Sequence, residues 1–362
     1  MRWSLLALAA ISTSPLVMFS LIGIGGAQTS NGYRVSDPIL HENLAIYLIH
    51  GKSVSGNVPL TLEEAMAKGV VRVKETSNVN QLEIENLGNE EVFVQSGDIV
   101  KGGKQDRTLM VSLVLPPKSG SIPIASFCVE EGRWSPRGRE DAGHFSTASA
   151  AVPSREMKLA MKAPMPAPVA DGSSNRRASA YAGETSQRQQ QVWEGVRRTQ
   201  AKLADRIGAP VRSAQSASSL QLALENERLI DVQQGYIKAL KAAGESSDDI
   251  VGFAFAINGQ INSADVYPSN GLFRKMWTKL LTASVIEAIG HNSEPNVGAP
   301  SVDAVMAFIA AADAGKANEK ALNGVVKLQT RDSDKAYAFE TSRATAASPA
   351  APAWVHRNYL AK

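Results

Sequence analysis

The chain has 362 residues, and 38 lysines and arginines nearly balance 35 aspartates and glutamates, for a formal net charge of +3. This balance excludes a general binder of nucleic-acid polymers, which carries a strong basic excess. Hydrophobic residues make up 44% of the chain, enough for one large domain or two small ones. The single cysteine, Cys128, excludes an intrachain disulfide, so packing must stabilise the fold.

Residues 1–27 have the pattern of a signal peptide. Arg2 precedes an apolar run over residues 5–26, and the small residues of Gly25–Ala27 suit a cleavage site. We therefore expect an exported protein, either periplasmic or extracellular. The alternative is an uncleaved anchor, because an apolar run of about 20 residues can span a bilayer. Only in that case would the membrane be a partner.

Residues 33–135 are predicted to be the β-rich half of the globular domain. Short apolar or alternating runs favour strands, and Pro123 favours an edge or the start of a strand. Thr61, with Glu64 three residues later, is a capping box that predicts a short helix ending before Gly69. The predicted strands cover 44–49, 70–73, 81–85, 91–95, 109–115 and 122–131, and the predicted helix covers 62–68.

Residues 136–186 differ in composition from both flanks. Pro, Ala, Ser, Gly and Arg dominate and large apolar side chains are scarce, so the segment lacks the surface needed to fix its backbone. We predict a flexible insertion or linker, which leaves room for short helical pieces near Met157 and Met161.

Residues 187–343 are predicted to form a helical half of the same domain. Apolar residues at helical spacing predict several helices, and Asn258-Gly259 is a strong signal for a β-hairpin. An Ala/Pro-rich tail covers 344–362. The fold class is therefore α+β, a mostly antiparallel β-rich half followed by helices and a β-hairpin–helix unit. The predicted helices cover 187–207, 220–243, a stretch that starts near Gly271, and 302–314; the predicted strands cover 251–257, 260–267, 325–329 and 337–340.

The densest polar cluster is Gly97–Arg107, between two predicted strands. Its paired glycines free the backbone to approach a ligand or to adopt a positive φ, and its cationic and amide side chains suit a phosphate, sulfate or carboxylate. It is not a P-loop, because the lysine spacing and the following helix are missing. The alternative is a charged hairpin tip. The candidate ligand-binding residues are Gly102, Gly103, Lys104, Gln105 and Arg107, with Arg133 from a second cluster.

That second cluster is Cys128–Trp134, at the end of a predicted strand. Alternation along the strand places Cys128 and Glu130 on the face opposite Phe127 and Val129. Glu130 is the candidate general base, or else it pairs with an arginine. A catalytic cysteine needs a partner base, and no histidine is spaced to supply one, so Cys128 is expected to be a buried, inert thiol.

Other motifs are absent or ambiguous. Five scattered histidines and one cysteine form no metal-ligand pattern, and no motif names a cofactor. Neither Gly-x-Ser-x-Gly nor Gly-x-Gly-x-x-Gly occurs. Asn258, Gln260, Asn262 and Asp265 on the predicted hairpin, and Asn270 at the following helix start, suit turn formation and capping, unless the hairpin packs beside the glycine-rich loop and joins its site.

The two clusters resemble the first ARG-and-Rhodanese-Phosphatase-superfamily-associated protein domain family, a domain family of unknown function. Gly-Gly-Lys-Gln-Asp-Arg (102–107) and Cys-Val-Glu-Glu-Gly-Arg-Trp (128–134) are the specific parts of the resemblance. Genomic neighbours of the family include ADP-ribosylglycohydrolases, which implies, by association, a link to nucleotide or ADP-ribose metabolism. The predicted signal peptide weakens this link, and the long insertion is atypical of the family. Weaker matches lie at 63–75, 79–86, 191–196 and 252–281.

Three hypotheses of function follow. The first is a domain that binds a small anionic ligand through the Gly102–Arg107 loop. The second is a hydrolase, with Glu130 as its base and Lys104 or Arg107 stabilising negative charge. The third is an interaction protein of the cell envelope that uses the insertion and the tail. The sequence does not name the cofactor or a protein partner, and it does not decide whether the protein is an enzyme.

Overall fold

The computed structural model describes residues 32–76, 78–138, 140, 143–164, 174–292, 297–322, 324–344 and 353–362, with the backbone alone for 174–182. The predicted signal peptide lies outside these residues. Helices and antiparallel sheets both contribute, so the predicted α+β class is confirmed. Among the described residues, no helix combines the length and the apolar character needed to cross a bilayer.

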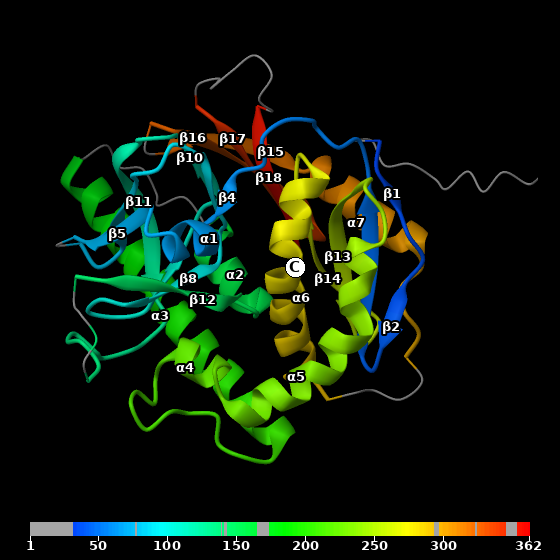
Figure 1. Ribbon diagram of the computed structural model, residues 1–362, viewed down its shortest axis with the longest axis horizontal. Helices are drawn as coiled ribbons and strands as arrows, with labels where there is room; N and C mark the ends of the chain where they lie inside the picture. The colour runs from blue at the N-terminus through cyan, green and yellow to red at the C-terminus, as the bar shows by residue number, and fades with distance from the viewer. Residues whose placement is uncertain are drawn as a thin grey trace, which may run out of the picture.

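The larger sheet runs through the middle of the molecule (Figure 1). Within the described residues it has nine antiparallel strands in the order β1-β3-β13-β14-β18-β17-β16-β15, with β2 paired to β3. Asn258 and Gly259 both have positive φ and form the tight turn between β13 and β14. The strands are β1 (Arg34–Val35), β2 (Ile39–His41), β3 (Leu44–His50), β13 (Ile250–Ile257), β14 (Gln260–Val266), β15 (Lys316–Leu322), β16 (Val326–Asp332), β17 (Ala336–Arg343) and β18 (Trp354–Ala361).

Two smaller sheets pack around a core of their own, with the orders β10-β7-β4 and β12-β8-β9-β11-β6-β5. The predicted strand 109–115 is divided between them, because β9 pairs with β11 while β10 pairs with β7. The strands are β4 (Leu60–Thr61), β5 (Val71–Glu75), β6 (Gln81–Asn86), β7 (Val92–Val94), β8 (Asp98–Gly102), β9 (Arg107–Leu109), β10 (Leu113–Leu115), β11 (Gly120–Cys128) and β12 (Phe145–Ala151).

Helices cover both faces of the larger sheet. The buried helix α6 contacts β13 on one face and β12 of the smaller sheets, and α7 covers the opposite face of the larger sheet. The predicted capping box is confirmed at α1, where Thr61 and Glu64 bond each other's backbone amides. The helices are α1 (Leu62–Ala67), α2 (Arg155–Lys162), α3 (Ser174–Ile207), α4 (Leu220–Leu224), α5 (Glu227–Leu240), the 3-10 helix η1 (Lys241–Glu245), α6 (Asn270–Ile289) and α7 (Val302–Asp313).

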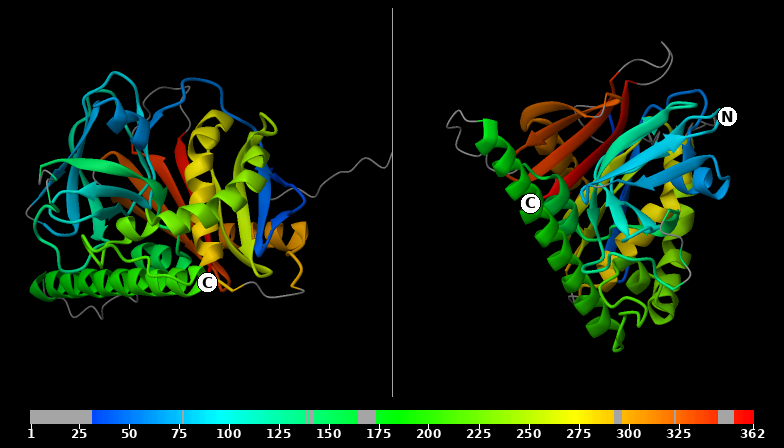
Figure 2. Two further views of the ribbon diagram at one scale, coloured as in Figure 1. Left: turned by 60° about the horizontal axis from the view of Figure 1, so that its bottom comes forward. Right: turned by 90° about the vertical axis from the view of Figure 1, so that its left-hand side faces the viewer.

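The long helix α3 runs along one side of the molecule (Figure 2). Gln189 of α3 is buried, and its side-chain amide bonds both the backbone N–H and the backbone carbonyl of Cys128 in β11. This two-point contact attaches α3 to the end of β11, where the second sequence cluster begins.

Residues 143–164, which we predicted to belong to a flexible insertion, instead form β12 and α2. β12 pairs with β8, and Met157 and Met161, one helical turn apart, are fully buried in the main core. The helical pieces expected near these methionines are therefore present. Residues 174–186, also predicted to be flexible, form the first part of α3, and residues 165–173 lie outside the described residues.

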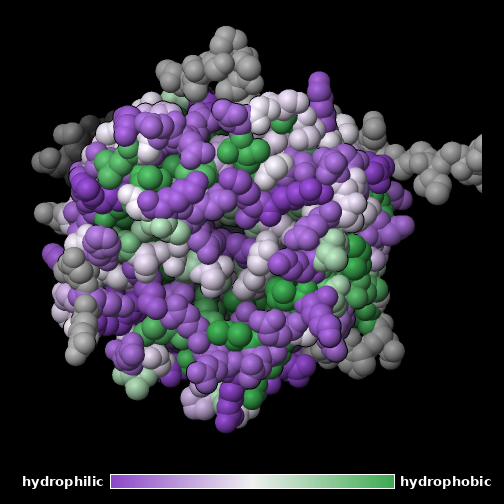
Figure 3. Space-filling model, viewed as in Figure 1, coloured by the Kyte–Doolittle hydropathy of each residue, from purple (hydrophilic) through white to green (hydrophobic). Residues whose placement is uncertain are grey.

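The face in Figure 3 is mostly hydrophilic, with small separate hydrophobic patches.

The predicted tail also differs from expectation, because its residues 354–361 form β18 between β14 and β17 in the larger sheet. Residues 345–352 of the tail lie outside the described residues.

Candidate functional site

The fold brings the two sequence clusters together. β9 pairs with both β8 and β11, so the loop after β8 and the loop after β11 lie side by side. Arg133 joins them, because its guanidinium donates to the carbonyls of Gly102, at 3.2 Å, and Gly103, at 3.1 Å. Lys104 is exposed, and its backbone N–H donates to Glu75 Oε1 at 2.8 Å.

Gly102 and Gly103 are needed for packing as well as for backbone shape. Both have positive φ. A Cβ at Gly102 would lie 2.6 Å from the carbonyl oxygen of His144, and one at Gly103 would lie 2.3 Å from the Phe145 ring. These glycines therefore let β12 approach the loop closely, a requirement that exists without any ligand.

Asp106 is the centre of this region, although our sequence reasoning gave it no role. Its carboxylate is fully buried and accepts two bonds from Arg137, both at 2.8 Å, one from Ser219 Oγ at 2.8 Å and one from the Gly102 N–H at 3.0 Å. Burial raises the pKa of the Asp106 carboxyl, against the bonds from Arg137, which lower it. Arg137 was not a candidate site residue, because it lies in the segment that we predicted to be flexible.

Glu130 is also fully buried. One carboxylate oxygen accepts from the Asp106 N–H at 3.1 Å and lies 2.7 Å from Arg133 Nε, and the other lies 3.5 Å from Arg137 Nη1. A general base needs a carboxylate oxygen that is free to accept a proton from the substrate or a water molecule. Glu130 is enclosed by two arginines and a backbone amide, which is the environment of a structural carboxylate.

Arg107 and Gln105 form a different pair inside the end of the smaller sheets. Both are fully buried, and Arg107 Nη1 donates to Gln105 Oε1 at 2.9 Å. Arg107 Nε and Nη2 and Gln105 Nε2 have no hydrogen-bond partner among the described residues, although Nη2 lies 3.6 Å from Glu75 Oε2. The half-exposed Trp134 ring covers the guanidinium, with its centroid 5.9 Å from Arg107 Cζ.

Cys128, directly across the β9–β11 ladder from Arg107, should resist alkylation in the folded protein. It is buried, and burial raises the pKa of its thiol to about 11, so at pH 8 roughly one thiol in a thousand is the reactive thiolate. We expect iodoacetamide at pH 8 to label Cys128 in urea and to leave it unlabelled in buffer, as measured by mass spectrometry. Rapid labelling of the native protein would contradict this account.

A second buried network links the sheets. Ser112 Oγ lies 2.9 Å from His356 Nδ1, and His356 Nε2 lies 3.0 Å from Asp265 Oδ1. The residue types match a catalytic triad. However, the cavity beside Asp265 and Lys162 has a volume of only about 20 Å³, which is room for one water. Lys162, which lines this small cavity, is itself buried, and burial lowers the pKa of its ammonium group to about 7.

The polar residues of the β13–β14 hairpin line a separate cavity with α2, α3 and α6, and none of residues 102–107 or 128–134 lines it. The described residues also contain no group of three or more His, Cys, Asp or Glu side chains placed to hold a metal ion.

Comparison with known proteins places the whole described chain in one family. The model of the ARG and Rhodanese-Phosphatase-superfamily-associated Protein domain matches residues 32–360. The chain belongs to this family. The match spans both sequence clusters and every described helix and strand except the last residue of β18. The two β-rich parts and the helices between them therefore make up one ARG and Rhodanese-Phosphatase-superfamily-associated domain, whose function is unknown. No curated protein matches the chain, and no solved structure does.

Proposed function

We propose that this domain binds a small anion at Arg107 and Gln105, beneath Trp134. The proposal rests on three buried N–H-bearing nitrogens without a hydrogen-bond partner among the described residues: Arg107 Nε, Arg107 Nη2 and Gln105 Nε2. Leaving a buried donor unsatisfied costs about 1–3 kcal/mol, so an acceptor at this point is strongly favoured.

The chemistry of these donors suits a phosphate, sulfate or carboxylate group. A guanidinium presents its donors as a planar fork that matches such oxyanions, and an adjacent amide adds a further donor. Among the described residues, Arg107 lies within 4 Å of one carboxylate, that of Glu75. Oε2 of Glu75 faces Arg107, and Oε1 of Glu75 accepts from the Lys104 N–H. Phosphate-bearing metabolites, including nucleotide derivatives, belong to this class. If residues 1–27 direct export, the protein meets its ligand outside the cytoplasm.

The rival hypotheses have less support. A hydrolase would need a base with a free oxygen, whereas both oxygens of Glu130 are engaged, with Arg133, Arg137 and the Asp106 amide. An envelope interaction protein would use the insertion and the tail. Of the described parts of those segments, β12, α2 and β18 pack into the fold, and residues 174–186 form the start of α3.

Gln105→Glu is the sharpest test. The new carboxylate keeps an acceptor for Arg107, so the fold should be retained, but it replaces the donor with a negative charge that repels an anion. We expect phosphate or sulfate to raise the melting temperature of the wild-type protein above that in chloride at equal ionic strength. This increase should disappear in Gln105→Glu. Differential scanning fluorimetry measures both, since a ligand at 100 times its Kd stabilises by about 2.7 kcal/mol.

Gln215→Glu is the matched control, because Gln215 is exposed and lies outside both clusters. It should respond to phosphate and sulfate as the wild-type protein does. The proposal is wrong if no oxyanion among phosphate, sulfate, acetate and AMP stabilises the wild-type protein, or if Gln105→Glu retains the full increase.

A further inference from the structure

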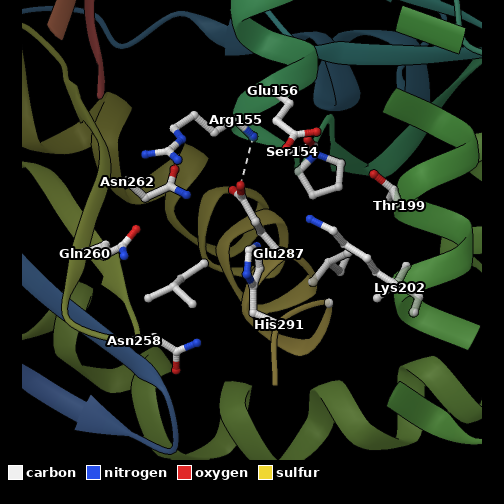
Figure 4. A pocket seen from close by; sticks show the side chains of 15 residues that line it. Ser154, Arg155, Glu156, Thr199, Lys202, Asn258, Gln260, Asn262, Glu287 and His291 are labelled. Carbon is white, nitrogen blue, oxygen red and sulfur yellow. Dashed lines mark hydrogen bonds between the residues drawn. The ribbon is translucent and has the colours of Figure 1, made fainter. Parts of the chain in front are cut away.

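A polar cavity of about 250 Å³ lies between α2, α3, α6 and the β13–β14 hairpin (Figure 4). It takes side chains from four elements that are far apart in the sequence. Its volume suits a small metabolite, because pockets for drug-sized ligands start at roughly 300 Å³. Neither sequence cluster contributes to it, so it is distinct from the anion site proposed above.

One side of this cavity offers unpaired acceptors. Glu287 Oε1 accepts from the Arg155 N–H at 2.9 Å, whereas its Oε2 is buried without a hydrogen-bond partner among the described residues. Asn262 Oδ1 is also buried without a hydrogen-bond partner among the described residues, and Asn262 as a whole is 6% exposed. α6 ends at Ile289, so the negative end of its dipole adds to the field here. This side therefore suits a cationic donor.

The other side of the cavity is cationic. Lys202 and Thr199 reach in from α3, opposite the amides of Asn258, Gln260 and Asn262 (Figure 4). Lys202 makes no ion pair with any residue that the structure describes. Arg155, at the start of α2, reaches instead toward Asn262, and its Nη1 donates to the carbonyl oxygen of Ile261 at 3.5 Å (Figure 4).

The other titratable side chains that line the cavity, Glu156 and His291, add no net charge to it. Glu156 lies 3.4 Å from Arg198, which neutralises it. Burial, followed by the charge of Lys202, lowers the pKa of His291, so its ring is neutral at pH 7. The cavity therefore presents the Glu287 carboxylate and the Asn262 amide oxygen on one side, with Arg155 next to them, and Lys202 on the other side.

We infer that this cavity binds a small zwitterion, of the size and chemistry of a free amino acid. Its ammonium group donates to Glu287 Oε2 and Asn262 Oδ1, and its carboxylate accepts from Lys202 on the opposite side. Charge-assisted hydrogen bonds are roughly twice as strong as neutral ones, so a ligand with both charges gains at both ends.

Calorimetric titration with free amino acids tests this inference. We expect at least one of the common amino acids to bind, and its deaminated and decarboxylated analogues to bind at least about tenfold more weakly, because each lacks one charge-assisted contact. Glu287→Gln keeps the acceptor for Arg155 and removes the charge, so it should fold and lose affinity by a similar factor. Lys202→Gln, at an exposed position, should do the same.

Two controls make the same changes outside the cavity. Glu194→Gln on α3 and Lys238→Gln on α5 alter exposed side chains that do not line it, and both should bind as the wild-type protein does. The inference is overturned if no amino acid binds, if glycerol or a singly charged analogue binds as tightly as the zwitterion, or if Glu287→Gln and Lys202→Gln retain wild-type affinity.

Discussion

Replacing Asp106 by alanine is expected to lower the free energy of unfolding by about 3–5 kcal/mol, because removing one partner of a buried ion pair leaves the other charge uncompensated. Asp106 is fully buried, Arg137 donates to both of its oxygens, and Arg133 Nη2 lies 3.5 Å away. The Ser219 hydroxyl and the Gly102 N–H would lose their acceptor as well. Urea unfolding followed by circular dichroism measures the change.

Asp248→Ala is the matched control, because Asp248 pairs with Arg274 at 3.0 Å but its side chain is 91% exposed. Exposed pairs contribute at most about 1 kcal/mol, so this variant should unfold close to the wild-type midpoint. A loss below about 1 kcal/mol in Asp106→Ala would show that the buried cluster does not hold the two loops together. Because Asp106 and Gln105 are adjacent, the two experiments separate stability from binding within one loop.

Lys279→Met is expected to have an effect of similar size, a loss of about 3–5 kcal/mol, for the same electrostatic reason. Lys279 lies on α6 with 7% of its side chain exposed, and its ammonium donates to Asp98 Oδ1 in β8 at 3.0 Å. The other oxygen of Asp98 accepts from the Gln95 N–H at 2.9 Å. This ion pair joins the buried helix to the smaller sheets, and its loss leaves the Asp98 carboxylate buried. Chemical denaturation measures the loss.

Lys275→Met, one helical turn away, provides the comparison. Its pair with Glu64 has a similar length, 2.9 Å, but both side chains are partly exposed, so solvent screens the interaction. The double variant Lys279→Met/Asp98→Asn should recover part of the loss, because it removes the uncompensated charge. Equal losses in Lys279→Met and Lys275→Met would contradict the buried-pair explanation.

The sequence by itself determined the elements whose signals are local. The Thr61–Glu64 capping box starts α1, and the Asn258-Gly259 pair makes the β13–β14 turn, because these contacts join residues within three positions of each other. The spacing of apolar residues likewise located α6, alanine content located α7, and the residues of the two clusters were recognised as neighbours of strand ends.

Strands stabilised by distant partners were decided only by the tertiary structure. β18 lies between β14 and β17, and β12 lies against β8, so each gains its hydrogen bonds from residues far along the chain. The alanine- and serine-rich sequence of β12 carries little strand signal of its own, and β18 follows an Ala/Pro-rich stretch of the chain. The burial of Met157 and Met161 in α2 likewise depends on the main core, which a local reading of composition cannot see.

The roles of the charged residues were also decided in three dimensions. The sequence alone allowed Glu130 to be a base or an ion-pair partner. In the structure Arg137 lies beside Glu130, and with Arg133 it encloses this carboxylate in a cluster of ion pairs. The polar cavity at Glu287 had no sequence motif, because its lining comes from α2, α3, α6 and the hairpin. The charge of a residue can be read from the sequence, but burial and the identity of its partners set the strength of its interactions, and those depend on the whole fold.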